Sequence, residues 1–498
     1  MKRYILVIDQ GTTTTRCIIF NNFGEIEWVE KKELRQIYPN PGWVEHNPDE
    51  IWDSVLITIK KSLESLNLKP KDITSIGITN QRETTIVFDR ETGKPLHNAI
   101  VWQCRRSDTI CEEIKNRGLE DFIHKKTGLV VDPYFSLTKL IWLLRNNSDL
   151  RKKVEKGEVG FGTVDTFLLY KLTKGKSFST DFSNASRTMM FNINSLKWDE
   201  EILNKFDIPK NILPDVKMSS SLFGITDKEI IGGEIPITSL IGDQQASLFG
   251  QLCLEKGMVK NTYGTGSFIL MNTGEKKIFS KKGLLTTIAW GINEKVYYAL
   301  EGSVFISGAV VQWLRDGLKI INSSEEVEEI ARSVDSTDGL YLVPAFVGLG
   351  TPYWDMYAGG LIIGITRKTT KAHIALAAIE SIAFQTKEVI DVMENETKEK
   401  IKILRVDGGA SMNNLLLQKQ ADFLNINVER PKILETTAFG AFLLSGLGIG
   451  VIKYENLKNF VKIDRVFKPS LEKEEFDKRY KQWKEAVSRS LGWRKVMM

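Results

Sequence analysis

Cysteine and histidine are both scarce in this chain of 498 residues, and each occurs four times. The cysteines have no CxxC spacing and are too few for a disulfide framework, so we interpret them as reduced thiols of the core. They are Cys17, Cys104, Cys111 and Cys253. The histidines form neither a metal-ligand spacing nor a catalytic triad, and we assign no role to them. They are His46, His97, His124 and His373.

Long apolar runs and basic blocks are absent as well. The N-terminal run Tyr4 to Ile8 stops at Asp9, too early for the apolar region of a signal peptide, and no later run reaches membrane-spanning length. The formal net charge of +5 is spread over short pairs such as Lys60-Lys61. Nucleic-acid binders concentrate their positive charge instead. We therefore expect no nucleic-acid partner, no membrane insertion and a cytoplasmic location.

The remaining composition is that of an ordinary globular protein, with 42% hydrophobic and 26% charged residues. A chain of this length exceeds one hydrophobic core and predicts two large domains.

Two similar hairpins lie about half a chain apart. The first has an apolar run at Tyr4 to Ile8, a glycine-threonine loop at Asp9 to Thr15 and a second apolar run at Cys17 to Phe20. The second has strands at Met258 to Thr262 and Phe268 to Asn272 around a loop with the same residue types. A hairpin loop excludes a P-loop that leads from a strand into a helix. The recurrence predicts a duplicated domain.

Helical and strand patterns alternate around the hairpins, which predicts two α/β domains with mixed sheets flanked by helices. We place the boundary near residue 250, giving domains 1–250 and 251–498. The expected helices are Pro48 to Leu66, Leu137 to Asn146, Val304 to Leu314 and Lys371 to Asn395. The expected strands are Ile73 to Thr79, Thr85 to Asp89, Val159 to Thr163 and Ile403 to Val406. A final helix, Glu472 to Trp493, is expected to dock on the core through Phe476, Tyr480, Trp483, Val487 and Leu491.

Three glycine-containing turns have the chemistry of a nucleotide site. The first loop offers glycine for close approach, hydroxyl and amide donors, and Arg16 for phosphate oxygens. The second loop, Gly264 to Ser267, repeats this chemistry. The third turn, Asp407 to Asn413, follows a strand and would let a purine approach the backbone. Each turn could by itself be a structural turn, but two phosphate loops facing one another across a cleft would be an improbable accident.

A metal ion is expected beside such loops, because phosphoryl transfer depends on alignment and on neutralising phosphate charge. Mg²⁺ favours one or two carboxylates with phosphate oxygens and water, and Asp9 and Asp243 stand beside the two loops. Asp243 lies between the halves and is our candidate general base. The structural alternative for Asp243 is an N-cap of a helix that begins at Gln244.

Arg82 and Glu83 are the candidates for binding a polyol, because a fork donor and a bidentate acceptor suit paired hydroxyls. Adjacent residues of this kind are more often a solvated surface pair. The polar neighbours Asn80, Gln81 and Thr84 favour a site, since so many polar groups are costly to bury without a ligand or a network.

Taken together, these motifs resemble the FGGY family of carbohydrate kinases in the actin-like (ribonuclease H-like) ATPase superfamily, and within it the glycerol kinases. The resemblance extends along the whole chain. It is carried by Gly42 to His46, Asn80 to Thr85, Val101 to Arg106, Gly242 to Ala246 and Asn261 to Gly266. It implies two actin-like domains with a nucleotide cleft between them, and transfer of phosphate from ATP to glycerol in glycerol catabolism, giving sn-glycerol 3-phosphate.

The resemblance also assigns residues. It implies phosphate contacts for Thr12, Thr13, Thr14 and Arg16, and further nucleotide contacts for Thr265, Gly308, Gln312, Gly409 and Asn413. It implies glycerol contacts for Arg82, Glu83, Tyr134, Asp243 and Gln244. It makes Trp102 and Phe268 the apolar wall, although both aromatics could equally be core residues. A homodimer or a higher homo-oligomer is expected.

One stretch departs from the family. Several bacterial glycerol kinases that this sequence resembles carry a glycine-rich loop with an arginine, which binds fructose 1,6-bisphosphate as an inhibitor at a subunit contact. The corresponding stretch here, Ile231 to Ile237, has no arginine and contains Glu234. Lys228 is the only cation near it in the sequence, so we expect no inhibition through this loop.

Two rival functions remain open at this point. A kinase for a pentulose or another sugar would keep the fold and change the acceptor. A nucleotide-switched binding protein or filament would need no small polar pocket, which would leave Arg82, Glu83 and Asp243 without a role.

Overall fold

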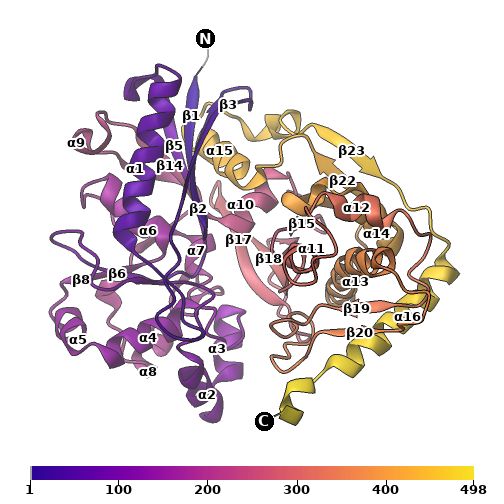
Figure 1. Ribbon diagram of the computed structural model, residues 1–498. Coiled ribbons are helices and arrows are strands. Elements are labelled where there is room, and N and C mark those ends of the chain that lie inside the picture. The colour runs from indigo at the N-terminus through magenta and orange to yellow at the C-terminus, as the bar shows by residue number, and fades with distance from the viewer. Residues whose placement is uncertain (1–2, 498) are drawn as a thin grey trace.

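The computed structural model describes residues 3–497. Its two halves each contain one large mixed sheet, and Figure 1 shows the N-terminal half in indigo to magenta beside the C-terminal half in pink to yellow. The first sheet consists of β1 (Tyr4–Gln10), β2 (Thr14–Asn21), β3 (Ile26–Glu33), β5 (Ile73–Asn80), β13 (Ser220–Ile225) and β14 (Pro236–Gly242). The second consists of β15 (Val259–Tyr263), β16 (Ser267–Gly274), β17 (Leu285–Ile292), β18 (Lys295–Val304), β21 (Ile403–Asp407), β22 (Asn427–Pro431) and β23 (Ile463–Phe467).

Helices cover both sheets, and short strand pairs lie around them. The helices are α1 (Pro48–Ser65), α2 (Asp108–Asn116), α3 (Glu120–Thr127), α4 (Ser136–Asn146), α5 (Ser148–Glu155), α6 (Val164–Leu172), α7 (Phe182–Ala185), α8 (Glu200–Lys205), α9 (Lys228–Ile231), α10 (Asp243–Gly250), α11 (Gly308–Asp316), α12 (Glu326–Ala331), α13 (Lys371–Thr397), α14 (Asn414–Leu424), α15 (Thr436–Gly448) and α16 (Lys473–Ser490). The short pairs are β4 (Glu45–His46) with β7 (Ala99–Ile100), β6 (Ile86–Asp89) with β8 (Val159–Gly162), β9 (Ser179–Asp181) with β12 (Asp215–Lys217), β10 (Phe191–Asn192) with β11 (Lys197–Trp198), and β19 (Tyr341–Val343) with β20 (Leu361–Ile363).

The two large sheets repeat one topology. In the first, the order β3-β2-β1-β5-β14 combines an antiparallel meander with two parallel strands added beside β1. In the second, β18-β16-β15-β21-β22 has the same order and the same directions. The predicted duplication is therefore present in the structure.

The apolar run in β1 is continuous because this strand is buried on both faces. Leu6 and Ile8 face a core shared with α1 and α6, while Ile5 and Val7 face a core shared with α10 and α15. Successive side chains of a strand point to opposite faces. A central strand between two helical layers is therefore hydrophobic at every position.

The second of these cores joins the halves of the chain. It combines residues of β1 and β2 with residues of β16, β17 and β18, and α15 packs on the first sheet although it comes from the C-terminal part of the chain. The rings of Phe20 and Phe442 stack here with centroids 4.8 Å apart. The predicted boundary near residue 250 coincides with the end of α10 and stays a prediction.

Two predicted segments differ from the structure. The first loop is limited to Gly11, Thr12 and Thr13, because hairpin pairing extends both strands to the Gln10↔Thr15 pair. The helix expected over Val304 to Leu314 is wrong at its start: Val304 is the last residue of β18, held by pairing with Ser267, and α11 begins at Gly308. An apolar run alone does not distinguish a strand end from a helix start.

The terminal helix α16 docks on the C-terminal core, as predicted. Phe476, Trp483 and Val487 are buried in that core, and Trp483 stacks on Phe384 with centroids 5.1 Å apart. Leu491 was expected to join them, but it lies beyond the end of α16 and is 38% exposed.

All four cysteines are buried and unpaired, which agrees with their interpretation as core thiols. Within residues 3–497, no helix combines the length and the apolar character needed to cross a membrane.

Candidate active site

Three loops of the N-terminal half leave the sheet side by side. The parallel register aligns Gln10 with Asn80 and Asn80 with Gly242, so the carboxyl ends of β1, β5 and β14 meet at one edge. The chain continues from them into the first glycine-threonine loop, into Gln81 to Glu83, and into Asp243. Sequence segments more than 150 residues apart are thereby brought together at the place where open α/β sheets bind ligands.

The first loop is tight and carries one exposed hydroxyl group. The amide of Gly11 donates to the Thr14 carbonyl over 2.9 Å, and Thr13 is exposed. The indole Nε1 of Trp102 donates to the Thr12 hydroxyl over 2.9 Å. Arg16, on β2, forms an ion pair with Glu435, which immediately precedes α15. Among the predicted phosphate contacts, Arg16 therefore already has an anionic partner from the other half.

The second loop supports the start of α11. The amides of Ser307 and Ala309 donate to the Thr265 carbonyl, and that of Gly308 donates to Gly264, over 2.8 to 3.1 Å. Register places Thr262 beside Asp407, so this loop and the turn at Gly408 emerge together from β15 and β21. The C-terminal sheet thus repeats the arrangement of the N-terminal one.

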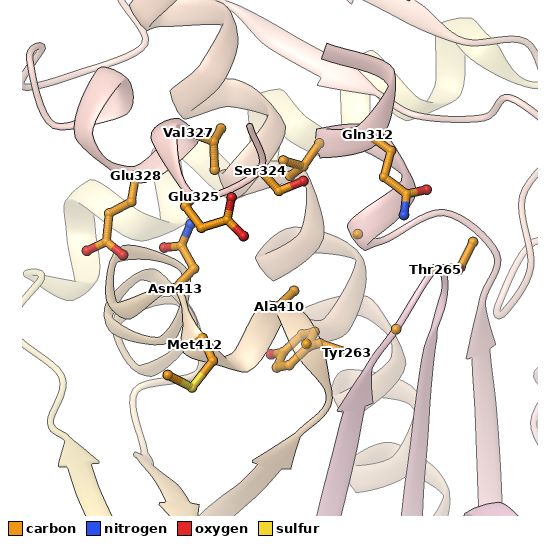
Figure 2. A pocket seen from close by; sticks show the side chains of 14 residues that line it. Tyr263, Thr265, Gln312, Ser324, Glu325, Val327, Glu328, Ala410, Met412 and Asn413 are labelled. Atoms are coloured by element: carbon orange, nitrogen blue, oxygen red, sulfur yellow. The ribbon is translucent and has the colours of Figure 1, made fainter. Parts of the chain in front are cut away.

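A pocket of about 450 Å³ opens between these turns. Figure 2 shows Thr265 and Gln312 on one side of it, with Glu328, Asn413 and Met412 opposite. All five residues predicted to complete the nucleotide site line it, namely Thr265, Gly308, Gln312, Gly409 and Asn413. Their role in nucleotide binding stays a prediction.

A segment that leads into α12 and includes its first residues also lines this pocket and was missed from the sequence. It contributes Ser324, Glu325, Val327 and Glu328. Glu328 accepts a hydrogen bond from the Asn414 amide over 2.9 Å, which ties this segment to the third turn. Its run of acidic residues has the composition of a solvated helix start, so only the contact with the third turn reveals it.

The surface interpretation of Arg82 and Glu83 is wrong, because their exposed fractions are only 3% and 1%. Glu83 has a φ of +57°, a conformation uncommon for residues other than glycine and often found at functional sites. Its Oε1 accepts from the Arg187 Nε over 2.6 Å. The pair is therefore part of a buried network.

The Arg82 guanidinium lies at the centre of the acceptor cluster. Its Nε is 3.1 Å from Asp243 Oδ1, its Nη2 donates to the Tyr134 hydroxyl over 3.2 Å, and its Nη1 donates to Gln245 Oε1 over 3.2 Å. The remaining edge of the guanidinium faces Glu301. Four side chains from three distant segments thus converge on one cation.

Three aromatic rings lie beside this polar cluster. Trp102 is 5.5 Å from Tyr134 and 6.3 Å from Phe268 between centroids, both in edge-to-face contacts. Each ring is only partly buried, and Phe268 comes from the C-terminal half. Polar groups on one side and apolar rings on the other suit a small molecule that has both hydroxyl groups and a hydrocarbon face.

Gln244 is held by a lysine from the other sheet. Its Oε1 accepts from Lys260 Nζ over 2.5 Å, and that ammonium also donates to Thr262 over 2.8 Å. Burial lowers the pKa of Lys260 to about 8, against the opposing effects of Asp407 and Asp243. The lysine therefore connects the predicted glycerol-binding amide to β15.

Asp243 is the first residue of α10 rather than its N-cap, which is Gly242. Its Oδ1 accepts from the Gln244 amide over 2.7 Å. Burial raises the pKa of Asp243, although the neighbouring Arg82 opposes this. Burial likewise raises the pKa of Asp9 to about 7; Arg16 opposes the shift, and Glu435 and Asp243 add to it.

This pair of carboxylates fits a magnesium ion. The negative charge of Asp243 helps to raise the pKa of Asp9, and a divalent cation bound by both would relieve the cost of keeping both ionised. The described residues contain no group of three or more His, Cys, Asp or Glu side chains able to hold a metal. Two carboxylates suffice when phosphate oxygens and water complete the shell.

Four residues of the cluster were missed from the sequence: Arg187, Gln245, Lys260 and Glu301. Lys260 is the one charged residue of β15, and Glu301 is the one charged residue in the buried part of β18. A lone charge in an apolar strand is costly unless it is paired, and this signal could have marked both residues. Arg187 and Gln245 have no comparable local signal.

The loop Ile231 to Ile237, which departs from the family, has more positive charge near it than the sequence suggested. Lys228 is not the only nearby cation, because Lys176 lies close enough to Glu234 to interact with it. Lys174 and Lys176 are themselves paired with Glu229 and Asp227, at 2.5 and 2.8 Å. The additional positive charge is thus already neutralised.

Family models match nearly the whole chain. The N-terminal domain model of the FGGY family of carbohydrate kinases matches residues 4–250, and the C-terminal domain model of that family matches residues 259–448. The chain belongs to the FGGY family of carbohydrate kinases. This membership confirms the prediction of an ATP-dependent kinase.

Named relatives of this FGGY kinase cover it from end to end. "Glycerol kinase 2" of Thermotoga maritima is 59% identical over 494 residues, which are 99% of this chain and 100% of that protein. "Glycerol kinase" of Caldanaerobacter subterraneus subsp. tengcongensis is 56% identical, over 99% of both chains.

Solved structures of FGGY kinases confirm the predicted pair of actin-like domains. The crystal structure of Plasmodium falciparum glycerol kinase with ADP is similar, with a TM-score of 0.93, 37% identity and 98% of each chain covered. The ligand-bound xylulose kinase of Lactobacillus acidophilus shares the fold at a TM-score of 0.87 and 22% identity, over 99% of this chain and 97% of that one.

Proposed function

We propose that this FGGY kinase transfers the γ-phosphoryl group of ATP to a terminal hydroxyl of glycerol, giving sn-glycerol 3-phosphate in glycerol catabolism. One observation carries the proposal: a buried arginine, Arg82, is shared by Asp243 and Tyr134 beside a partly exposed aromatic wall. This cluster has the polarity for a short polyol. The end-to-end similarity to named glycerol kinases supports the same acceptor.

Asp243 acts as the general base in this proposal. Its carboxylate accepts the proton of the attacking hydroxyl, and burial makes it more basic than an ordinary aspartate. Arg82 and Glu83 hold the two remaining hydroxyls, and Tyr134 and Gln244 fix the orientation. The rings of Trp102 and Phe268 cover the hydrocarbon backbone. Closure of the domains would exclude water, which would otherwise compete as acceptor.

Asp9 and Asp243 would hold Mg²⁺, which supplies charge neutralisation on the phosphate oxygens when bound. Thr12, Thr13, Thr14 and Arg16 would donate to the transferred phosphates. For Arg16 this requires exchange of the Glu435 carboxylate for a phosphate.

The division of labour between domains is part of the proposal. Residues 1–250 would carry the first phosphate loop and most of the glycerol site, and residues 251–498 the second phosphate loop and the adenosine site. The pocket between Thr265, Gln312 and Asn413 supports this assignment of the adenosine. Assembly into a homodimer or a higher homo-oligomer is tested by sedimentation.

ATP turnover with and without glycerol tests the function. A kinase needs the acceptor, whereas a nucleotide-switched binding protein turns over ATP without it. D-xylulose in place of glycerol tests the sugar-kinase alternative. We expect ADP release only with glycerol, and sn-glycerol 3-phosphate as the product, identified by oxidation with an enantiospecific glycerol-3-phosphate dehydrogenase. Faster turnover with D-xylulose, or turnover that is independent of any acceptor, would refute the proposal.

A further inference from the structure

Glu301 is a fully buried carboxylate that reaches the acceptor cluster from the C-terminal half. It lies on β18 and has an exposed fraction of 0%. Its Oε2 accepts from Arg82 Nη1 over 2.6 Å, and its Oε1 accepts from Arg82 Nη2 over 3.1 Å. This bidentate contact joins residues 219 positions apart in the sequence.

Arg187 completes the network around Glu301. Its Nη2 donates to Glu301 Oε1 over 3.0 Å, while its Nε donates to Glu83 over 2.6 Å. Arg187 thus connects Glu301 to the second residue proposed to bind the acceptor. We call Arg82, Glu83, Arg187 and Glu301 the buried bridge.

The charges of the buried bridge make Glu301 a permanent anion. Burial by itself would raise its pKa, but Arg187 and Arg82 lower the pKa to about 2. Removing one partner from a buried ion pair leaves an uncompensated charge and is strongly unfavourable. Glu301 therefore holds one edge of the Arg82 guanidinium, and only its Nε side is directed to Asp243, whose side chain is partly exposed.

We infer that Glu301 and Arg187 are positioning residues, which orient Arg82 and Glu83 for the acceptor hydroxyls. Because Glu301 belongs to the C-terminal sheet, the acceptor site is complete only while the Arg82–Glu301 contact joins the two halves. The inference deepens the proposed function and rests on the roles given there to Arg82 and Glu83. Neither Glu301 nor Arg187 touches the reacting atoms.

The test compares Glu301→Gln with a matched control. Glutamine keeps the shape of the side chain, but it places an amide N–H against an arginine donor. Glu380 is the control, because it is also a buried carboxylate with two cationic partners, Lys419 and Arg479. Those partners lie within the C-terminal half, away from the acceptor cluster. Two further variants keep the charges of this ion pair: Glu301→Asp keeps the negative charge, and Arg187→Lys keeps the positive charge.

For Glu301→Gln we expect kcat/KM for glycerol to fall roughly 10- to 100-fold, with the KM for ATP nearly unchanged. Saturating glycerol should also raise the Tm of this variant less than that of wild type. Glu301→Asp should recover part of the loss. Glu380→Gln should lower the Tm, but it should not change kcat/KM for glycerol relative to the KM for ATP.

Several outcomes would overturn the inference. Unchanged glycerol kinetics in Glu301→Gln, or equal losses for glycerol and ATP, would show that Glu301 has no selective positioning role. If Glu301→Gln fails to fold, Glu301→Asp and Arg187→Lys provide the test instead. Unchanged glycerol kinetics in both, or equal losses for glycerol and ATP, would overturn the inference. If wild type does not phosphorylate glycerol at all, the proposed function fails first, and that result is distinguishable from the others.

Discussion

Arg82 and Asp243 form an ion pair at the edge of the acceptor cluster, with Arg82 Nε 3.1 Å from Asp243 Oδ1. The two side chains differ in access, since that of Arg82 is 2% exposed and that of Asp243 is 30% exposed. Glu301 holds the guanidinium of Arg82, whereas the carboxylate of Asp243 is accessible to an incoming hydroxyl. A general base needs this access to its substrate proton.

Asp243→Asn keeps the shape of the side chain and removes the base. We expect the rate of glycerol phosphorylation to fall roughly 10²- to 10⁴-fold while the protein stays folded. Steady-state kinetics and circular dichroism measure the two effects. The control is Asp165→Asn, which alters a buried carboxylate bonded to Thr163 and Thr180. A near wild-type rate for Asp243→Asn would rule out its role as base.

Glu83→Gln tests the acceptor site without leaving a cavity. We expect a loss of about 1.5 to 3 kcal/mol in kcat/KM for glycerol, the scale of a hydrogen bond to a charged group. Alanine is less informative, because truncation would leave Arg187 without the partner that it contacts over 2.6 Å. ATP affinity, measured by titration, should stay the same. Equal losses for both ligands would point to a structural role.

Gly408 and Gly409 should respond differently to alanine. At Gly409 an added Cβ would meet nothing within 4 Å, and this residue lines the pocket proposed for adenosine. Gly409→Ala should therefore weaken ATP binding by about 1 to 2 kcal/mol and leave the Tm unchanged. At Gly408, φ is +85° and the Cβ would lie 2.4 Å from the Tyr263 carbonyl oxygen.

Gly408→Ala should lower the Tm through backbone strain of about 1 to 3 kcal/mol. Thermal unfolding and ATP titration of both variants provide the measurements. Normal ATP binding by Gly409→Ala would place the nucleotide elsewhere.

His46 should destabilise the protein in acid. It is 1% exposed, and burial lowers the pKa of His46 to about 4. Between pH 6.5 and 4 the unfolded chain binds a proton at this residue that the folded chain does not. The free energy of unfolding should therefore fall as the pH drops through this range, by about 3 kcal/mol in total from this residue.

His46→Gln should remove that part of the acid sensitivity, as measured by urea unfolding at several pH values. His97→Gln, at a half-buried histidine, is the control. Parallel pH curves for wild type and His46→Gln would contradict the assignment.

Fructose 1,6-bisphosphate should not inhibit the enzyme through the loop Ile231 to Ile237. Glu234 repels a bisphosphate, and the nearby Lys174 and Lys176 are already paired with acids. Glycerol phosphorylation across millimolar inhibitor is the measurement. Gly232→Ala is preferred to Gly233→Ala, because a Cβ at Gly233 would lie 2.4 Å from Pro70 and one at Gly232 would lie 3.8 Å from it. The φ of +79° at Gly232 adds backbone strain, so thermal unfolding of Gly232→Ala is the control. Saturable inhibition that disappears in Gly232→Ala would overturn this expectation.

Local pattern predicted most of the elements near the site. The strands beside both phosphate loops are visible because they are buried on two faces, which leaves unbroken apolar runs such as Tyr4 to Ile8. Their ends were less predictable. The hairpin register extends β1 to Gln10, and the pairing of Val304 with Ser267 converts an expected helix start into strand.

The sequence by itself determined the chemistry that is available: two glycine-threonine hairpins, a glycine turn after a strand, and the polar segment containing Arg82 and Glu83. These features are legible because they depend on residue type and short-range spacing. Only the tertiary structure decided which charges meet. Glu301 is 219 residues from Arg82, and their contact depends on how two sheets pack across one core. Burying either charge alone would cost free energy, and only their contact offsets that cost. This contact is made by the packing of the two sheets, so it cannot be read from the local sequence.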